Sequence, residues 1–353
     1  MYYRDSGRVI ESYRLDHAIF RVDQDRWFIV CALAAGALLP LVVSEYWLVS
    51  ILIPFMVFSV AAVGLNILVG YAGQLSLGTG GFMAIGAFAA YNFATRLPEL
   101  NQLICFVLAG LTAALAGVIF GLPSLRIKGF YLAVATLALQ FFVEWLFQRV
   151  GWFTNYSSTG VITAPRLQMF GYDFSAPGPR YLLLYGIVVV AAVTAKNLVR
   201  SATGRAWMAI RDMDVAAESI GVRPLRTKLL AFAVSSFYWG LAGALWVFFY
   251  IGTVETQGFD LNRSFQILFM IIIGGLGTIV GSFFGAAFIV FLPILLNAAF
   301  ASLGKTFPAD VMSHFQLLVY GAAMLLILIV EPHGLARMWQ SAREKFRIWP
   351  FPY

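Results

Sequence analysis

The chain has 353 residues, of which 61% are apolar and only 12% are charged, and its mean hydropathy is +0.82. This composition excludes an ordinary water-facing globular protein and indicates a chain that crosses a membrane several times. The formal net charge of +7 is no sign of nucleic-acid binding here, because lysine and arginine accumulate on the inner side of membrane proteins.

The apolar residues form repeated runs of about 17 to 25 residues, each long enough to cross roughly 30 Å of hydrocarbon as a helix. A membrane barrel would show alternating segments of about ten residues instead. We therefore predict an all-α polytopic membrane protein. About ten membrane helices are expected, at residues 27–43, 47–69, 80–96, 102–122, 129–149, 181–199, 228–251, 264–280, 282–302 and 313–331.

The positions of lysine and arginine orient these helices. If the N-terminus is inside, the inner segments hold 18 of the 24 cations, and the outer segments hold the rest: Arg96, Arg149, Arg166, Arg180, Arg263 and Lys305. This bias predicts that both termini lie in the cytoplasm. Residues 1–26 are then a cytosolic segment and no signal peptide, 27–331 the transmembrane domain and 332–353 a cytosolic tail. The sequence leaves open whether 264–302 forms two helices or one kinked helix.

Two glycine clusters interrupt the apolar runs, GYAGQLSLGTGG at 70–81 and IGGLGTIVGS at 273–282. Such glycines either allow close helix packing or mark a discontinuous helix whose free backbone groups line a solute path. The first cluster favours a discontinuous helix, because Gln74, Ser76 and Thr79 are poor lipid-facing residues.

Other polar residues within the predicted membrane helices are few. Asn66 lies in the second span, and Thr136, Gln140 and Glu144 share one face of the fifth by their four-residue spacing. That face either lines a functional path or forms a polar seam between helices. The candidate path residues are Asn66, Gln74, Ser76, Thr79, Thr136 and Gln140.

The longest outer connection, residues 150–180, mixes aromatic residues with hydroxyl groups, glycine and proline. We expect an ordered cap or docking surface, with a solvated connector as the alternative. The candidate docking residues are Thr154, Asn155, Tyr156 and Thr159.

A charged amphipathic insert, residues 196–228, separates two apolar runs on the inner side. Its central part, GRAWMAIRDMDVAAESIG at 204–221, predicts a short helix that ends at Gly221. The helix is suited either to a lipid surface or to a groove of a partner protein. The acids Asp212, Asp214 and Glu218 offset the nearby bases, which favours a protein partner.

Residues for enzyme chemistry do not form a recognisable pattern. Cys31 and Cys105 are expected to be buried reduced thiols, and the three histidines lack the spacing of metal ligands. The sequence shows no Ser/His/Asp set and no phosphate loop with its lysine. We therefore predict a transport subunit that binds no cofactor or metal itself and is no enzyme.

Four blocks in the same order resemble the permease subunits of the branched-chain amino acid type of ABC importer, specifically the LivM-like subunit. They are GLNILVGYAGQLSLGTGGFMAIGAFAA at 64–90, GLPSLRIKGFYLAVATLAL at 121–139, GRAWMAIRDMDVAAESIGV at 204–222 with KLLAFAVSSFYWGLAGALW at 228–246, and IIGGLGTIVGSFFGAAFIVFLP at 272–293. The resemblance runs over nearly the whole transmembrane region.

The resemblance implies a fold similar to the vitamin B12 and ribose type of importer permease, in a bacterial inner membrane. It also implies alternating access driven by two cytosolic ATPase subunits that bind ATP and Mg, with a second homologous permease and a periplasmic solute-binding protein as further partners. Residues 204–221 become the coupling helix, in which Val215 replaces the usual glutamate. Its candidate contacts are Arg205, Arg211, Asp212, Asp214, Ala216, Ala217, Glu218 and Gly221.

The solute stays open. Thr79 stands where the family typically has histidine, so leucine, isoleucine or valine is only the family default, and relatives of this type are thought to handle urea, amides or aromatic acids. Two other interpretations compete with an ABC permease. A stand-alone secondary transporter or channel would need its own coupling-ion site, and a membrane scaffold would have no use for polar glycine segments.

Overall fold

The computed structural model describes residues 23–124, 131–157, 160–169, 171–302, 309–331 and 333–348. The predicted cytosolic segments 1–26 and 332–353 lie partly outside these ranges, and Thr159 lies outside them.

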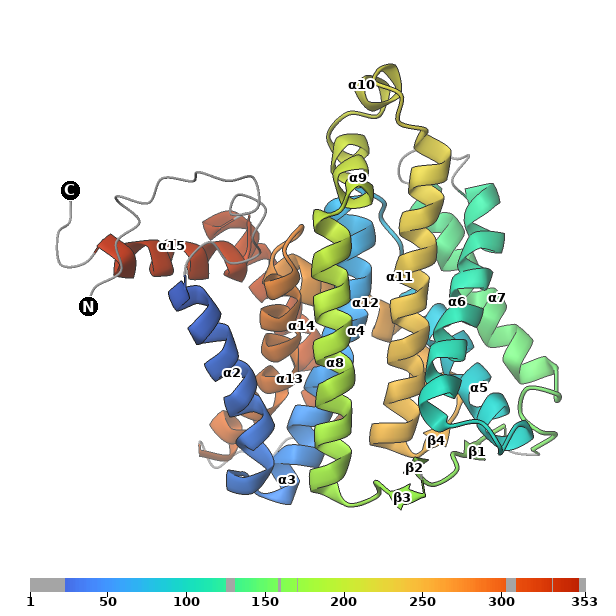
Figure 1. Ribbon diagram of the computed structural model, residues 1–353. Helices are drawn as coiled ribbons and strands as arrows, with labels where there is room; N and C mark the ends of the chain where they lie inside the picture. Colours follow the sequence, from blue (N-terminus) through green and yellow to red (C-terminus); the bar gives the residue numbers. More distant parts are fainter. Residues whose placement is uncertain are drawn as a thin grey trace.

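Helices make up most of the described chain (Figure 1). They are α2 Asp23–Val42, α3 Glu45–Trp47, α4 Ile53–Asn66, α5 Thr79–Arg96, α6 Gln102–Ser124, α7 Tyr131–Arg149, α8 Pro177–Arg200, α9 Ala202–Asp212, α10 Asp214–Ser219, α11 Pro224–Trp246, α12 Leu261–Gly274, α13 Ile279–Ser302, α14 Ala309–Val330 and α15 Leu335–Ile348. Three π-helical turns, η1 Leu48–Leu52, η2 Ile67–Tyr71 and η3 Val247–Ile251, extend or join these helices, and η4 Thr256–Phe259 is a 3₁₀ turn.

Four short strands form two antiparallel pairs. Strand β1 Ile162–Thr163 pairs with β4 Thr253–Val254, and β2 Gln168–Met169 pairs with β3 Tyr172–Asp173. The first pair joins the outer loop to the end of α11, which are distant in sequence.

A helix occupies each of the ten ranges predicted to cross the membrane. Within the described residues, five helical stretches are long and apolar enough to do so: Glu45–Tyr71, Gln102–Pro123, Pro177–Arg200, Pro224–Ile251 and Ile279–Phe300. The apolar parts of Glu45–Tyr71 and Pro224–Ile251 are mostly buried, whereas only a third or less of the apolar part is buried in the other three. These two are therefore the central helices, and the other three lie at the periphery.

Helix α11 packs against α6, α5 and α4. Its contact with α5 depends on two glycines, because a Cβ atom added at Gly86 would overlap the main chain of Gly240. Around this crossing lie the rings of Phe82, Phe232 and Trp239, all fully buried. Small residues thus bring two backbones together, as expected where helices associate in a membrane.

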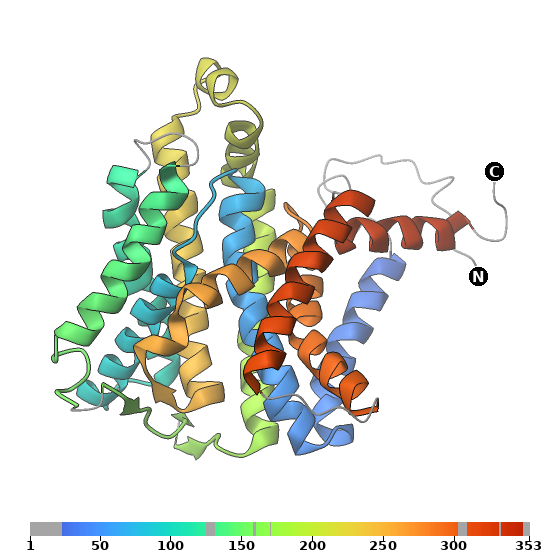
Figure 2. The same ribbon diagram turned by 180° about the vertical axis from the view of Figure 1, so that it is seen from behind.

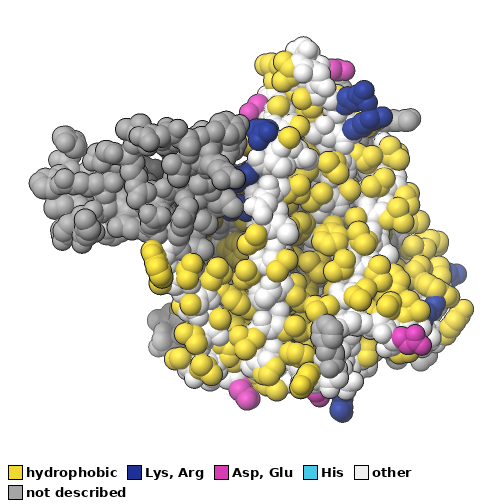
Figure 3. Space-filling model, viewed as in Figure 1, with side chains coloured by type: hydrophobic (Ala, Val, Ile, Leu, Met, Phe, Trp, Pro, Cys, Tyr) yellow, Lys and Arg dark blue, Asp and Glu magenta, His cyan; other side chains and the backbone are white. Residues whose placement is uncertain are grey.

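The two ends of the bundle differ. Helices α9 and α10 project from one end, and the strands lie at the other; α15 runs across the bundle direction toward the α9 end (Figures 1 and 2). Apolar side chains cover the middle of the face shown in Figure 3, while charged side chains gather near the two ends. This distribution fits a bundle whose middle faces lipid.

Candidate functional site

The insert at 196–228 forms the projecting tip of the molecule (Figure 1). In place of the single helix predicted over 204–221, the structure has two, α9 and α10, which are separated at Met213. Met213 adopts an extended backbone conformation, with φ −160° and ψ 103°, which no helix can include. The predicted end at Gly221 is confirmed, since Gly221 has a φ of +91° and the amide of Val222 bonds back to the carbonyl of Ala217.

Helix α9 is anchored on the membrane bundle. Trp207 is fully buried, and its indole nitrogen donates a hydrogen bond to the carbonyl of Thr227 at 3.0 Å. Ile210 is also buried, and Gly204 packs directly on the main chain of Val199. Helix α9 is therefore packed on the neighbouring ends of α8 and α11.

Helix α10 presents an apolar surface to solvent. Met213, Val215 and Ile220 are 63%, 77% and 75% exposed, whereas Ala217 is buried beneath them. Three large apolar side chains exposed together on a projecting tip indicate a contact with another molecule. We call Met213, Val215 and Ile220 the apolar tip.

The charged residues of the tip form short-range pairs. Asp214 accepts an ion pair from Lys228 at 2.6 Å, and Arg211 pairs with Asp212 at 2.9 Å. Arg205 donates to the carbonyl of Arg200 on the preceding helix. Ala216 and Glu218 are exposed on α10.

Arg211 also points toward the bundle, where its Nη1 donates to the carbonyl of Gly70 at 2.9 Å.

The first glycine cluster is a break in a helix, as predicted. Helical structure stops at Tyr71 and resumes at Thr79. Gln74 is 4% exposed and Thr79 is fully buried, yet neither Gln74 amide atom nor the Thr79 hydroxyl has a hydrogen-bond partner among the described residues. Ser76 is buried too, and its hydroxyl accepts from the amide of Gly78 at 3.4 Å. Buried polar groups without partners are costly unless water or a ligand satisfies them.

The second glycine cluster also separates two helices, which resolves the alternative of one kinked helix over 264–302. Helix α12 ends at Gly274 and α13 begins at Ile279. The side chain of Asn66 binds the segment between them: its Oδ1 accepts from the amide of Gly277 at 2.8 Å, and its Nδ2 donates to the carbonyl of Thr278 at 2.8 Å and to Ser282 Oγ at 2.9 Å. Asn66 thus joins the second break to the helix that precedes the first.

The polar face of α7 lies against the start of α5. Thr136 Oγ1 accepts from the amide of Leu77 at 2.9 Å, and Gln140 Oε1 accepts from the amide of Gly81. Gln140 Nε2 donates to the carbonyl of Phe259 at 2.6 Å and to Glu144 at 2.7 Å. These bonds satisfy amides in and before the first turn of α5 that have no partner within the helix. The contacts favour the polar-seam interpretation of this face.

The predicted outer loop packs against the end of α5. Asn92 and Arg96, near the end of α5, donate to the carbonyls of Phe153 and Trp152 at 3.1 and 2.8 Å, and the Arg96 guanidinium lies 3.8 Å from the Trp152 ring centre. Thr154 is buried within the loop. Asn155 and Tyr156 have positive φ values of 49° and 57°, and Tyr156 is 79% exposed.

In the β2–β3 hairpin of this loop, hydrogen bonds from Ser175 to the Asp173 carboxylate lower the pKa of that group.

The part of the sequence that contains the projecting tip and both breaks matches one family of transporters. The family model described as "Branched-chain amino acid transport system / permease component" covers residues 47–328. The chain belongs to this family.

Curated proteins that are similar to this permease support the same assignment. The high-affinity branched-chain amino acid transport system permease protein LivM of Escherichia coli K12 is 31% identical over 338 residues, which cover 89% of this chain and 76% of that protein. A probable LivM of Methanocaldococcus jannaschii is 23% identical, with 81% and 92% covered, and the autoinducer 2 import system permease protein LsrC of Enterobacter sp. strain 638 is 28% identical, with 62% and 61% covered. No solved structure matches the chain.

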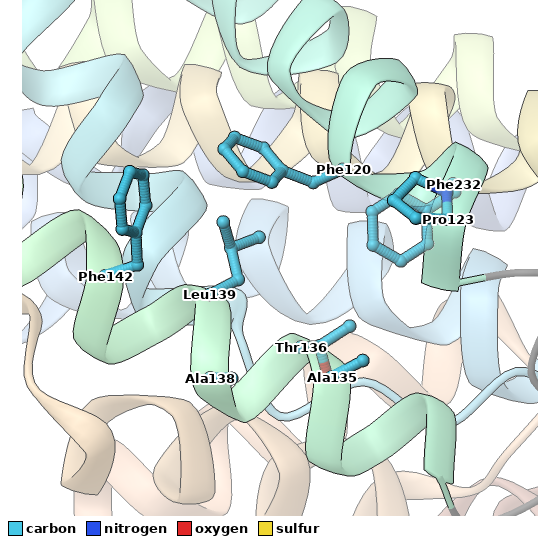
Figure 4. A pocket seen from close by; sticks show the side chains of 8 residues that line it. All are labelled: Phe120, Pro123, Ala135, Thr136, Ala138, Leu139, Phe142 and Phe232. Atoms are coloured by element: carbon cyan, nitrogen blue, oxygen red, sulfur yellow. The ribbon is translucent and has the colours of Figure 1, made fainter.

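The permease has an apolar pocket of about 310 Å³ between α6, α7 and α11 (Figure 4). Phe120 and Phe232 line one side and residues of α7, including Leu139 and Phe142, the other. Thr136 is the one lining residue with a polar side chain, and its hydroxyl already bonds to Leu77 and Ala133. The pocket suits a lipid chain or an apolar neighbour better than a charged solute.

Within the described ranges, no three His, Cys, Asp or Glu side chains come together in a way that holds a metal ion. Of the two cysteines, Cys105 is buried as predicted, whereas Cys31 is exposed, contrary to the prediction, because it lies on the peripheral helix α2.

Six buried polar residues in the described ranges were not among the predicted site residues, and three of them bond to the helix breaks or to the loop at 150–180. Ser264 Oγ accepts from the amide of Gly80 at 2.8 Å, Ser282 binds Asn66, and Asn92 holds the outer loop. Each is a polar residue in a predicted membrane helix, so the rule that singled out Asn66 would have found Asn92, Ser264 and Ser282 as well.

Proposed function

We propose that this chain is one permease subunit of an ATP-driven importer, whose apolar tip docks on a cytosolic ATPase. The observation that supports this proposal is that the tip exposes apolar side chains while its base is fixed to the membrane bundle. Val215 and Ile220 are exposed on α10, while Trp207 fixes α9 to the bundle. An apolar side chain that enters a groove of a partner contributes binding affinity. Because α9 is held on the bundle, a movement of the bound ATPase would be passed on to the membrane helices.

In this proposal ATP and Mg bind only to the two ATPase subunits, and this chain supplies no bond-making groups. A second homologous permease completes the translocation path, and a periplasmic solute-binding protein docks on the outer cap, which includes Thr154, Asn155 and Tyr156. ATP binding and hydrolysis then open the path alternately to the two sides.

We infer a ten-helix topology similar to the vitamin B12 and ribose type of importer permease, with both termini in the cytoplasm of a bacterial cell. Helices α9, α10 and α15 gather toward one end of the bundle, and the strands of the outer loop lie at the other (Figures 1 and 2). This arrangement agrees with the excess of lysine and arginine in the segments assigned to the inner side.

Branched-chain amino acids are the proposed solutes, because the E. coli and M. jannaschii relatives are named for them. A related small polar solute, such as urea, an amide or an aromatic acid, is the broader class. One relative is named for autoinducer 2 import, which supports the broader class of solutes.

Among the candidate path residues, Gln74 and Thr79 are the strongest, because their buried polar atoms have no partner within the described residues. A passing polar solute or water would supply the missing bonds. Asn66, Ser76, Thr136 and Gln140 already bind backbone groups. We place these four beside the path, as residues that hold the breaks open.

Co-purification of the full system tests the proposal. The tagged chain, expressed with its neighbouring genes, is expected to bring down two ATPases and to show solute-stimulated ATP hydrolysis with the binding protein. Proton- or sodium-driven uptake by the isolated chain would contradict this function and support a secondary transporter.

Exposed positions of α10 give a sharper test of docking than Ala217 or Gly221, since Ala217 is buried and Gly221 has a positive φ. Val215→Asp and Ile220→Asp are expected to weaken ATPase association by roughly tenfold or more, because each places a charge in an apolar contact. Tyr172→Asp is the matched control, since Tyr172 is 74% exposed at the other end of the bundle. Equal association for all three variants would remove the apolar tip from the ATPase contact.

A further inference from the structure

Arg211 lies in the last turn of α9, but its guanidinium contacts the helix breaks of its own chain. Nη1 donates to the carbonyl of Gly70 at 2.9 Å, while Nε and Nη2 both approach Asp212 Oδ1 at 2.9 Å. Gly70 belongs to η2, the last turn before the first break. One planar side chain therefore connects the tip to the end of a central membrane helix.

Glycines surround this side chain closely. A Cβ atom added at Gly73 would lie 2.9 Å from Arg211 Cγ and 3.3 Å from its Cα, and one added at Gly277 would lie 3.4 Å from Nη1. Gly73 and Gly277 have positive φ values of 68° and 73°. The arginine thus packs on the main chain of both breaks, with no flexible side chain between them to absorb a displacement.

The two breaks are themselves joined. The backbone of Gly70 lies against that of Gly277, where a Cβ atom at Gly70 would overlap the Gly277 amide. Asn66 accepts from that same amide at 2.8 Å and donates to the carbonyl of Thr278. A continuous series of contacts therefore runs from Arg211 through Gly70 to the segment between α12 and α13.

We propose that Arg211 is a positioning residue that transmits movement of the α9–α10 tip to both helix breaks. The inference rests on the proposed function, and it separates two roles within the tip. The apolar tip faces the ATPase, whereas Arg211 faces the permease itself. A charge-assisted bond to a helix-terminal carbonyl is strong and directional, and α9 is rigidly seated by Trp207, so a displacement of α9 must move Gly70 or break the bond.

Thiol labelling at the second break tests the transmission directly. Leu276 is 48% exposed between α12 and α13, so Leu276→Cys is the reporter, in a background with Cys31→Ser and Cys105→Ala. The complex of this chain with its second permease, ATPases and binding protein is reconstituted in proteoliposomes. The labelling rate is measured with and without a non-hydrolysable ATP analogue, beside solute uptake per ATP hydrolysed.

We expect the analogue to change the labelling rate in the reference protein and not in Arg211→Met. Uptake per ATP hydrolysed should fall roughly fivefold to tenfold in Arg211→Met, while ATPase association is retained. Arg211→Lys keeps the positive charge but has one donor nitrogen in place of the guanidinium fork, so it should give intermediate values for both measurements. Arg226→Met is the matched control, because Arg226 is exposed in the first turn of α11 and loses the same charge; it should behave as the reference.

Two results would overturn the proposal: a nucleotide-dependent labelling change that survives in Arg211→Met, or a reference protein that transports solute with no labelling change at Leu276→Cys. If Arg211→Met does not assemble, Arg211→Lys provides the test. A labelling change and an uptake per ATP hydrolysed equal to those of the reference protein in Arg211→Lys would then count against the proposal. A reference chain that binds no ATPase refutes the proposed function instead, which keeps the two failures distinct.

Discussion

Asn66 Nδ2 donates a hydrogen bond of 2.8 Å to the main-chain carbonyl of Thr278, 212 positions further along the chain. The same amide satisfies Gly277 N–H and Ser282 Oγ. A single buried side chain therefore supplies partners to several groups in the segment between α12 and α13. This explains how a break in the helical structure is tolerated inside the bundle.

Asn66→Leu should consequently destabilise the isolated chain by roughly 2 to 4 kcal/mol, because it leaves the Gly277 amide without a partner and removes the bonds to Thr278 and Ser282. The measurement is unfolding of the purified chain by SDS in mixed micelles. Ser59→Ala is the control on the same helix: Ser59 is also fully buried, but its hydroxyl bonds only to Phe55 one turn earlier. Similar midpoints for both variants would show that Asn66 does not hold the break.

Gln74→Leu should separate transport from stability. Both polar atoms of the Gln74 amide are buried and have no partner within the described residues, so their removal leaves no native bond broken. We expect the unfolding midpoint to stay the same or rise, and solute uptake to fall roughly tenfold through loss of a bond made only to the solute or its water. Uptake and SDS unfolding are measured beside Gln148→Leu, an exposed position on α7. Normal uptake would return the first break to a purely structural role.

The helix positions were predictable because each apolar run of membrane length became a helix. The breaks were also visible in the sequence, since only glycine tolerates the positive φ values of Gly73 and Gly277 without strain. Gly221 ended the tip helix for the same reason. These features are local, and local sequence determines them.

The division of the tip at Met213 was not predictable. Methionine is a good helix former, and nothing in AIRDMDV demands an extended residue. The division coincides with tertiary anchoring: Trp207 and Arg211 fix α9, and Lys228 fixes Asp214 at the start of α10. Such contacts join residues that are not neighbours in the sequence.

The partners of the polar residues were equally hidden. The sequence placed Thr136 and Gln140 on one helix face, but Gln140 bonds to Gly81 and Phe259, 59 and 119 positions away. Arg211 looked like one charge among several on an amphipathic helix, and its acceptor is the Gly70 carbonyl 141 positions earlier. A main-chain carbonyl carries no signal in the sequence that identifies it as a partner.

Gln140→Leu should behave oppositely to Gln74→Leu. It removes the acceptor of the Gly81 amide and the donor to the Phe259 carbonyl, both buried. We expect the chain to lose roughly 2 to 4 kcal/mol of unfolding free energy, since the Gly81 amide and the Phe259 carbonyl each lose a side-chain partner in a buried site. SDS unfolding measures the loss, again beside Gln148→Leu. A midpoint unchanged from the wild type would argue that Gln140 is available to the solute.

Gly86→Val tests the crossing of α5 with α11, one of the two central helices. The added side chain would meet the main chain of Gly240, which cannot rotate away, so α5 and α11 must separate. We expect a loss of about 3 kcal/mol or more, or failure to fold, because overpacking against backbone has no inexpensive relaxation. Gly186→Val on α8 is the matched control, since a Cβ atom there meets nothing within 4 Å. SDS unfolding and yield from the membrane are compared for both variants. Equal stability would mean that the close approach of α5 and α11 does not contribute to the fold, whereas a large loss in Gly86→Val alone would show that this crossing does not tolerate a side chain.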